Sequence, residues 1–159
     1  IKSILDKIIL KRKYIMYGIA GIILLQLGIW TWHQGKIYKN EETLFLDVIQ
    51  KNPSCVMAYN NLGFYYAQRG QLTDATMRYQ EAIKINPNHA KAYLNLGIVY
   101  VKENRLDEAV SVINQALAIN PNYPQAHYNL GNVYSKKRQI NDAISEYNKA
   151  LAIDPKFFL

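Results

Sequence analysis

The chain has 159 residues, a formal net charge of +7 and 12% aromatic residues, which suits one modest domain with an additional segment. Its single cysteine, Cys55, excludes an intrachain disulfide. Residues 53–159 hold eleven Lys and Arg against eight Asp and Glu. Their one basic run, Lys136-Lys137-Arg138, is interpreted as the solvated end of a helix, so the sequence predicts no nucleic-acid partner.

Two membrane-related elements are predicted at the N-terminus. Residues 1–13 place Ile and Leu at helical spacing among five Lys and Arg, which is typical of a basic amphipathic segment at a membrane surface. Residues 14–32 carry no charge and would extend roughly 28 Å as a helix, close to the thickness of a bilayer core. Aromatic residues stand at both ends, as at membrane interfaces. We therefore predict a transmembrane helix over 14–32; a buried core helix or a cleaved signal peptide is the alternative.

The charges that flank the predicted span indicate its orientation. Five basic residues precede it, whereas only Lys36 and Lys39 follow closely. The positive-inside rule then places the N-terminus in the cytoplasm. The rest of this predicted single-pass membrane protein would lie outside the cytoplasm, in a periplasm or an organelle lumen.

Residues 33–52 form a junction without a flexible Gly, Ser or Pro-rich run. Relative to Pro53, Phe45 and Val48 stand where Tyr79 and Ala82 stand relative to Pro87. The stretch from Glu41 to Asn52 therefore reads as the second helix of a degenerate leading half-repeat.

Residues 53–159 repeat with a period of 34 residues, which indicates a stacked repeat array. Apolar positions three and four apart in each block predict one buried helical face, and small residues recur where two helices must approach closely. Turns are predicted at Gly70, Asn104 and Arg138–Gln139, between a first and a second helix. The recurring residues are Pro53, Pro87, Pro121 and Pro155; Leu62, Leu96 and Leu130; Gly63, Gly97 and Gly131; Tyr66, Tyr100 and Tyr134; Ala75, Ala109 and Ala143; and Ala82, Ala116 and Ala150. The side chains that offer N-caps for the second helices are Thr73 or Asp74, Asp107, and Asn141–Asp142.

These positions resemble the tetratricopeptide repeat (TPR) family, whose pattern W-x2-L-G-x2-Y…A-x3-F…P has the same period. The three blocks span about 56–89, 90–123 and 124–157, and His127 is the clearest departure, in a slot that is usually aromatic. The resemblance implies an all-α fold: a right-handed TPR α-solenoid of three helix-turn-helix repeats and a partial leading repeat, after a single transmembrane helix.

In this family the first helices of the repeats line a concave groove that binds protein partners. By that resemblance the residues expected to bind an extended peptide are Asn61, Phe64, Lys91, Leu94, Asn95, Ile98, Tyr128, Asn129 and Asn132. Asn61, Asn95 and Asn129 recur one repeat apart, and each amide can give one donor and one acceptor to a peptide unit. The alternative is that Asn is simply a common consensus residue at this position.

Some family members clamp a C-terminal carboxylate with Lys, Asn and Arg. Here Asn60 and Phe64 stand at the Lys and Asn positions of the first repeat, and only Asn95 matches. Binding of chaperone C-termini is therefore not expected. No HExxH, GxSxG, P-loop or CxxC motif is present, so the sequence predicts neither an enzyme nor a cofactor or metal site.

The last residues, Phe157, Phe158 and Leu159, follow the third repeat directly, where a polar capping helix is usual. We expect this uncapped apolar edge to be a contact site, with a homo-oligomer as one outcome and a tail that folds back as the other. The passage from Trp30 to Phe45 is also similar to the last-span-to-TPR region of multi-pass glycosyltransferase-like membrane proteins. The sequence thus predicts a membrane-anchored TPR scaffold that helps to assemble a membrane-associated complex. The alternative is the C-terminal region of such a glycosyltransferase-like protein, with its catalytic part upstream.

Overall fold

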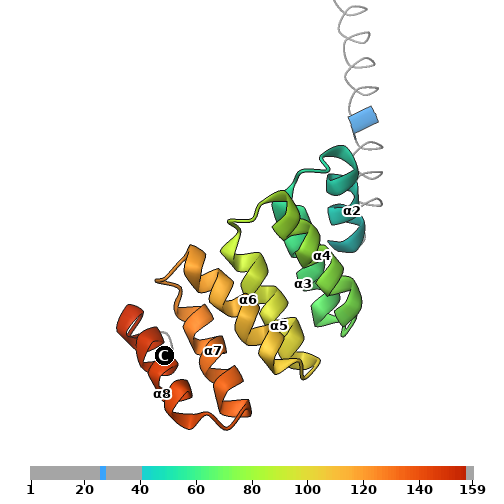
Figure 1. Cartoon of the computed structure of the whole chain (residues 1–159). Helices are drawn as coiled ribbons and strands as arrows, with labels where there is room; N and C mark the ends of the chain where they lie inside the picture. The colour runs from blue at the N-terminus through green and yellow to red at the C-terminus, as the bar shows by residue number, and fades with distance from the viewer. Residues whose placement is uncertain (1–25, 28–40, 157–159) are drawn as a thin grey trace, which may run out of the picture. The chain divides into compact units, whose positions relative to one another are not determined.

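The computed structural model describes residues 26–27 and 41–156, and every regular element among them is a helix (Figure 1). The prediction of an all-α fold is confirmed for this part of the chain. Its helices are α2 (Glu41–Lys51), α3 (Val56–Gln68), α4 (Leu72–Ile85), α5 (Ala90–Lys102), α6 (Leu106–Ile119), α7 (Pro124–Lys136) and α8 (Ile140–Ile153).

The chain divides into two compact units, Ile1–Leu44 and Phe45–Leu159. The predicted segment 1–13 lies outside the described residues, and so do nearly all of the predicted span 14–32 and the end of the chain, Phe157 to Leu159. None of the described helices combines the length and the hydropathy that a membrane span requires. The transmembrane helix therefore stays a prediction.

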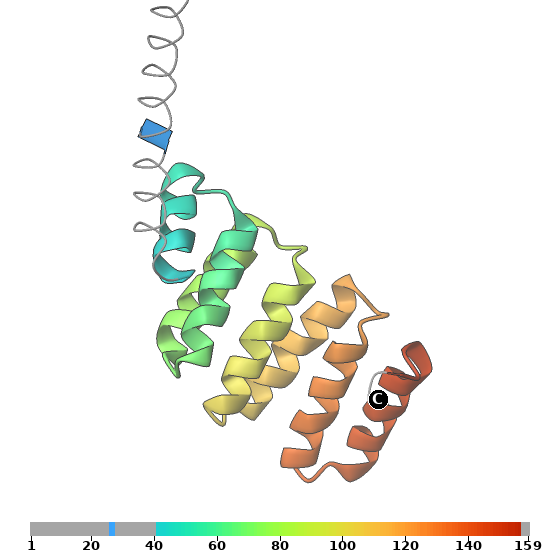
Figure 2. The same ribbon diagram turned by 180° about the vertical axis from the view of Figure 1, so that it is seen from behind.

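The second unit is built from three helical hairpins, α3–α4, α5–α6 and α7–α8, which follow one another in a row (Figures 1 and 2). Each hairpin packs against the next, α4 against α5 and α6 against α7. Successive first helices also contact each other, α3 with α5 and α5 with α7. Phe45 and Ile49 of α2 pack against the hydrophobic core.

The residues that recur every 34 positions form this core. Leu62, Leu96 and Leu130 are 0%, 4% and 2% exposed, and burying such a side chain contributes roughly 1.5–3 kcal/mol. The recurring alanines at 75, 109 and 143 and at 82, 116 and 150 are buried as well. One hairpin cannot bury both of its faces alone, so the stack of hairpins supplies the core.

The recurring glycine of each first helix lies directly against a second-helix side chain. A Cβ atom at Gly63 would come within 2.8 Å of Cε1 of Tyr79, and one at Gly131 within 2.6 Å of Cε1 of Tyr147. At Gly97 the neighbour is Cγ1 of Ile113, at 2.5 Å. These distances are shorter than any ordinary carbon contact. The glycines are therefore required by the close packing of the two helices in a hairpin.

The turns within the hairpins adopt the same conformation in all three repeats, at the predicted positions. Gly70, Asn104 and Arg138 have positive φ angles of 75°, 61° and 61°. The next backbone N–H donates back to the carbonyl five residues earlier, as from Gln139 to Tyr134 at 2.9 Å, which is the Schellman arrangement. Glycine adopts this left-handed backbone conformation without strain, whereas arginine adopts it at an energetic cost.

The predicted N-caps of the second helices were wrong. The N-cap residues are Gln71, Arg105 and Gln139, and none of their side chains forms a cap hydrogen bond. Because each helix starts directly after a Schellman turn, the observed N-cap lies two to three residues before the predicted one. Asp74, Asp107 and Asp142 instead lie in the first turn of each helix, where their charge favours the helix dipole.

Candidate functional site

A hollow of about 330 Å³ opens between the first two hairpins. Three of the residues predicted to bind a peptide, Phe64, Asn95 and Ile98, lie in its wall. The full lining, from α3, α4 and α5, is Phe64, Ala67, Gln68, Tyr79, Asn95, Ile98, Val99 and Lys102. Its walls are mostly apolar with a few polar groups, the usual composition of a ligand site.

Tyr79 of α4 also lines this hollow and was not predicted as a site residue. It is 1% exposed, and burial raises the pKa of its hydroxyl. No hydrogen bond joins this hydroxyl to another described residue, whereas the equivalent Tyr147 donates to Oδ1 of Asn132 at 2.8 Å. Comparing positions 64 and 79 with 132 and 147 in the sequence could have revealed this difference.

Asn61 and Asn95, two of the three asparagines that recur one repeat apart, are both hydrogen-bonded to Asn60. Nδ2 of Asn95 donates to Oδ1 of Asn60 at 3.0 Å across the α3–α5 contact, and Nδ2 of Asn60 donates to Oδ1 of Asn61 at 3.3 Å. Asn60 is only 3% exposed. Asn129 is different, because its Nδ2 donates to the backbone carbonyl of Gln125 in its own helix at 2.7 Å. The side chains of Asn61 and Asn95 thus belong to one short network.

The other predicted residues divide between exposed, paired and buried positions. Lys91 is exposed near the start of α5, whereas Leu94 is 4% exposed and belongs to the hydrophobic core. Leu94 therefore contributes packing between repeats rather than open surface. In α7, Asn132 is paired with Tyr147, whose ring lies 5.8 Å from that of Tyr128. The predicted binding residues are thus apolar at positions 64 and 98 and polar at the equivalent position 132.

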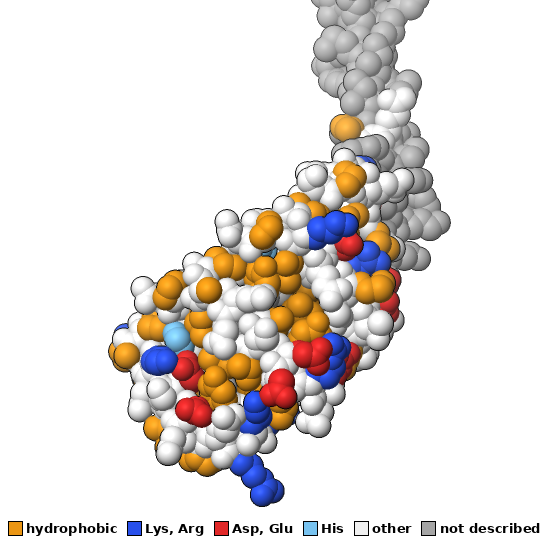
Figure 3. All heavy atoms as spheres, in the orientation of Figure 1, with side chains coloured by type: hydrophobic (Ala, Val, Ile, Leu, Met, Phe, Trp, Pro, Cys, Tyr) orange, Lys and Arg blue, Asp and Glu red, His pale blue; other side chains and the backbone are white. Residues whose placement is uncertain are grey.

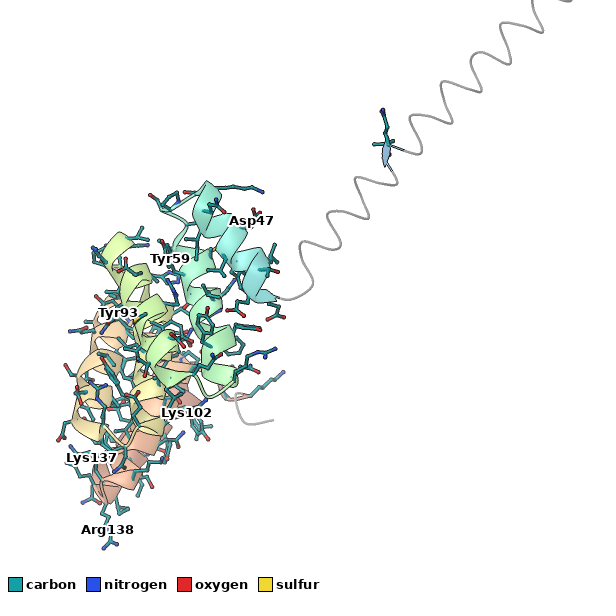
Figure 4. The ribbon with its side chains drawn as sticks, turned by 90° about the vertical axis from the view of Figure 1, so that its right-hand side faces the viewer. Asp47, Tyr59, Tyr93, Lys102, Lys137 and Arg138 are labelled. Carbon is teal, nitrogen blue, oxygen red and sulfur yellow. The ribbon has the colours of Figure 1, made fainter. Side chains whose placement is uncertain are left out.

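Lysines stand at the ends of two first helices, α5 and α7. Nζ of Lys102 donates to the carbonyl of Ala67 at 3.2 Å, which ties the end of α5 to the last turn of α3. Lys137 pairs with Asp107 at 2.5 Å and also lies toward this end of the unit (Figure 4). No acidic side chain lines the hollow. On the face shown in Figure 3, apolar patches alternate with small groups of Lys, Arg, Asp and Glu side chains.

His127 and Glu146 form a buried polar pair inside the third hairpin. Nδ1 of His127 lies 2.6 Å from Oε2 of Glu146, and Nε2 lies 3.0 Å from the carbonyl of Pro121. Nζ of Lys149 donates to the other carboxylate oxygen at 2.6 Å. Burial disfavours the charged carboxylate, but hydrogen bonds from Lys149 and His127 outweigh it and lower the pKa of Glu146. The sequence marked His127 as unusual without indicating its partner.

No cluster of three or more His, Cys, Asp or Glu side chains that could hold a metal ion occurs in residues 26–27 and 41–156.

The repeat array matches two protein-family models. Residues 65–103 and 99–138 match the family model described as TPR repeat, and residues 124–157 match the one described as tetratricopeptide repeat. No curated protein matches the chain. The matched stretches together extend from the end of α3 to the end of α8 and beyond.

Solved structures include several with the same fold. The crystal structure of MamA is 28% identical with a TM-score of 0.65, over 71% of this chain and 66% of that one. YrrB, described as a TPR protein with an unusual peptide-binding site, is 25% identical with a TM-score of 0.65, over 71% and 58%. The first TPR of Spaghetti (RPAP3), bound to the HSP90 peptide SRMEEVD, is 21% identical with a TM-score of 0.63, over 65% and 82%. The chain thus spans about two thirds or less of MamA and YrrB.

Proposed function

Because the chain belongs to the tetratricopeptide repeat family, we propose that it is a scaffold that binds a protein partner through an extended segment lying between α3 and α5. The observation that carries this proposal is the hollow of about 330 Å³ between those helices. It combines apolar walls from Phe64 and Ile98 with the amide of Asn95 and the ammonium of Lys102. Such a mixture suits a peptide, which brings apolar side chains and main-chain polar groups together.

The similar structures support peptide binding as the class of function. YrrB is described as having an unusual peptide-binding site, and the RPAP3 domain holds an HSP90 peptide, although its 21% identity speaks for the fold alone. The chaperone C-terminus itself is not the proposed ligand here. Asn60 is buried in the network with Asn61 and Asn95, and Phe64 replaces the second clamp residue.

We further propose that residues 14–32 anchor the scaffold in a membrane with the repeats outside the cytoplasm, where it helps to assemble a membrane-associated complex. The support is the uncharged Ile- and Leu-rich sequence and the basic residues before it. The intact mass of the native chain extracted from its membrane distinguishes two forms of this proposal. A mass near 18.3 kDa fits a single-span scaffold, and a mass several times larger fits the C-terminal region of a multi-pass protein.

Changing Asn61, Asn95 and Asn129 together to alanine tests the groove. We expect the partner recovered with the detergent-extracted chain to fall by about tenfold, since each lost hydrogen bond is worth roughly 0.5–1.5 kcal/mol. Quantitative mass spectrometry of the co-purified proteins measures this.

The control is Asn114→Ala on the exposed side of α6, which should leave recovery unchanged. Circular dichroism must show equal helicity in all three proteins. Recovery that is the same for the triple variant and the control would refute the role of these amides.

The last helix offers a second contact surface, and we propose that a second copy of the chain covers it. Ile140, Ile144 and Leu151 on α8 are 56%, 52% and 39% exposed. The equivalent residues of α6, which α7 contacts, are Leu106, Val110 and Leu117, and they pack against the core. The exposed residues of α8 thus occupy the positions that are covered by the next hairpin in α6.

Ile144→Asp should shift the chain toward the monomer in sedimentation velocity in mild detergent, because it places a charge in the apolar contact. Ser145→Asp, on the neighbouring exposed position, adds the same charge outside that face and should change nothing. If both variants sediment like the unaltered chain, α8 does not mediate self-association.

A further inference from the structure

The three hairpins share a pair of equivalent positions, one on the first helix and one on the second. These pairs are Phe64 with Tyr79, Ile98 with Ile113, and Asn132 with Tyr147. In the third hairpin the tyrosine hydroxyl donates to Oδ1 of Asn132 at 2.8 Å. In the first hairpin the tyrosine is kept, but the residue that would accept its hydrogen bond is a phenylalanine.

This substitution leaves the Tyr79 hydroxyl without that partner in a hollow whose walls are mostly apolar. Tyr79 is 1% exposed, lines the hollow and has no hydrogen-bond partner for its hydroxyl among the described residues. A hydroxyl that a bound group covers without bonding to it costs free energy. The fixed position of the ring, held against Gly63, means that the hydroxyl cannot turn away. The hollow therefore contains a preformed hydrogen-bonding group at its floor.

The walls above this group suit an aromatic ring. Phe64 is 51% exposed at the mouth of the hollow, and Ile98 and Val99 complete the apolar sides. Exposed aromatic surface of this kind gains most when a second ring packs against it. Lys102 and Gln68 at α5 and α3 lie among the lining residues with side chains that can donate to a main-chain carbonyl.

We propose that the hollow is a recognition pocket for a tyrosine side chain of the bound peptide, with its ring between Phe64 and Ile98 and its hydroxyl bonded to that of Tyr79. The pocket rests on the proposed peptide-binding function and names the residue that the groove selects. A phenylalanine in the same place fills the walls but leaves the Tyr79 hydroxyl unpaired, which is how polar sites reject analogues that lack a hydroxyl.

The test selects random heptapeptides displayed on phage against the whole chain in mild detergent. The unaltered chain should enrich peptides that share a tyrosine. Tyr79→Phe removes the hydroxyl without changing the shape of the floor and should enrich phenylalanine as readily as tyrosine. The matched control, Tyr147→Phe, removes a hydroxyl that already has a partner and should still select tyrosine.

A synthetic peptide of the enriched sequence then gives the magnitude. Its tyrosine-to-phenylalanine version should bind the unaltered chain about 3- to 10-fold more weakly, from one hydrogen bond, and should bind Tyr79→Phe with no such loss. Phe64→Asn supplies Tyr79 with the partner that Tyr147 has and should lower binding of the tyrosine peptide about tenfold or more, since the apolar wall is lost.

Each outcome separates the two proposals. Peptides that are enriched without tyrosine, or a Tyr79→Phe variant as selective as the unaltered chain, would overturn the tyrosine pocket and leave peptide binding intact. Failure to enrich any peptide with the unaltered chain would overturn peptide binding and the pocket with it. Circular dichroism confirms that each variant keeps the helicity of the unaltered chain.

Discussion

Leu96→Ala is expected to lower the free energy of unfolding by about 2–5 kcal/mol, the usual cost of removing a buried leucine side chain. Leu96 is 4% exposed and lies in α5, whose hairpin packs against a neighbour on each side. In a repeat array each unit is stabilised by its own contacts and by those with its neighbours. Damage to the middle hairpin should therefore weaken both interfaces at once.

The matched variant is Leu130→Ala in α7, where the leucine is 2% exposed. Urea denaturation should show a similar decrease in the free energy of unfolding for both variants. Hydrogen exchange should distinguish the two variants. Leu96→Ala should reduce amide protection from α3 to α8, whereas Leu130→Ala should reduce it chiefly in α7 and α8. Equal loss of protection throughout the array in both variants would show that the hairpins unfold as one unit rather than as neighbours.

Glu146→Val is expected to destabilise the protein by about 3–5 kcal/mol, because it leaves His127 buried without its charged partner. The two side chains are each 11% exposed, and the ring nitrogen lies 2.6 Å from the carboxylate. In the second hairpin the equivalent residues are Tyr93 and Val112. The double variant His127→Tyr with Glu146→Val recreates that pair and should recover most of the lost stability, as apolar replacements of buried ion pairs often do.

The same pair predicts how stability depends on pH. The pKa of Glu146 in the folded protein lies below its ordinary value of 4.5. Its charged form therefore stabilises the fold above that pH, and this contribution is lost as the pH falls through the lowered pKa. Thermal melts between about pH 3 and pH 7 span the reference pKa of a carboxyl group. As the pH falls, the melting temperature of the unaltered chain should decrease more steeply than that of the double variant. Parallel curves would mean that the carboxylate contributes nothing.

The periodic part of the fold could be read from the sequence because it depends on local rules. Leucine, glycine and alanine at fixed spacing specify which faces are buried, and Gly70, Asn104 and Arg138 mark turns that the structure places at positive φ. The N-caps were misplaced because acidic residues suit a first turn as well as a cap.

The individual features of the site could not be read in the same way. The contact between Asn60 and Asn95 joins side chains 35 residues apart, and that between His127 and Glu146 joins side chains 19 residues apart. Both depend on rotamers that the period does not specify. Leu94 is next to Asn95 in α5 but is buried in the core. The packing between neighbouring repeats determines which residues of a first helix are exposed, and the family pattern does not specify it.

Photo-crosslinking in the cells that make the protein tests most directly whether the first helices form its binding surface. Benzoylphenylalanine replaces Ile98, which lines the hollow on α5, or Ser111, which is exposed on the second helix α6. The account predicts a covalent adduct with a partner protein from position 98 and none from position 111. Adducts with the same partner from both positions, or from position 111 alone, would contradict it.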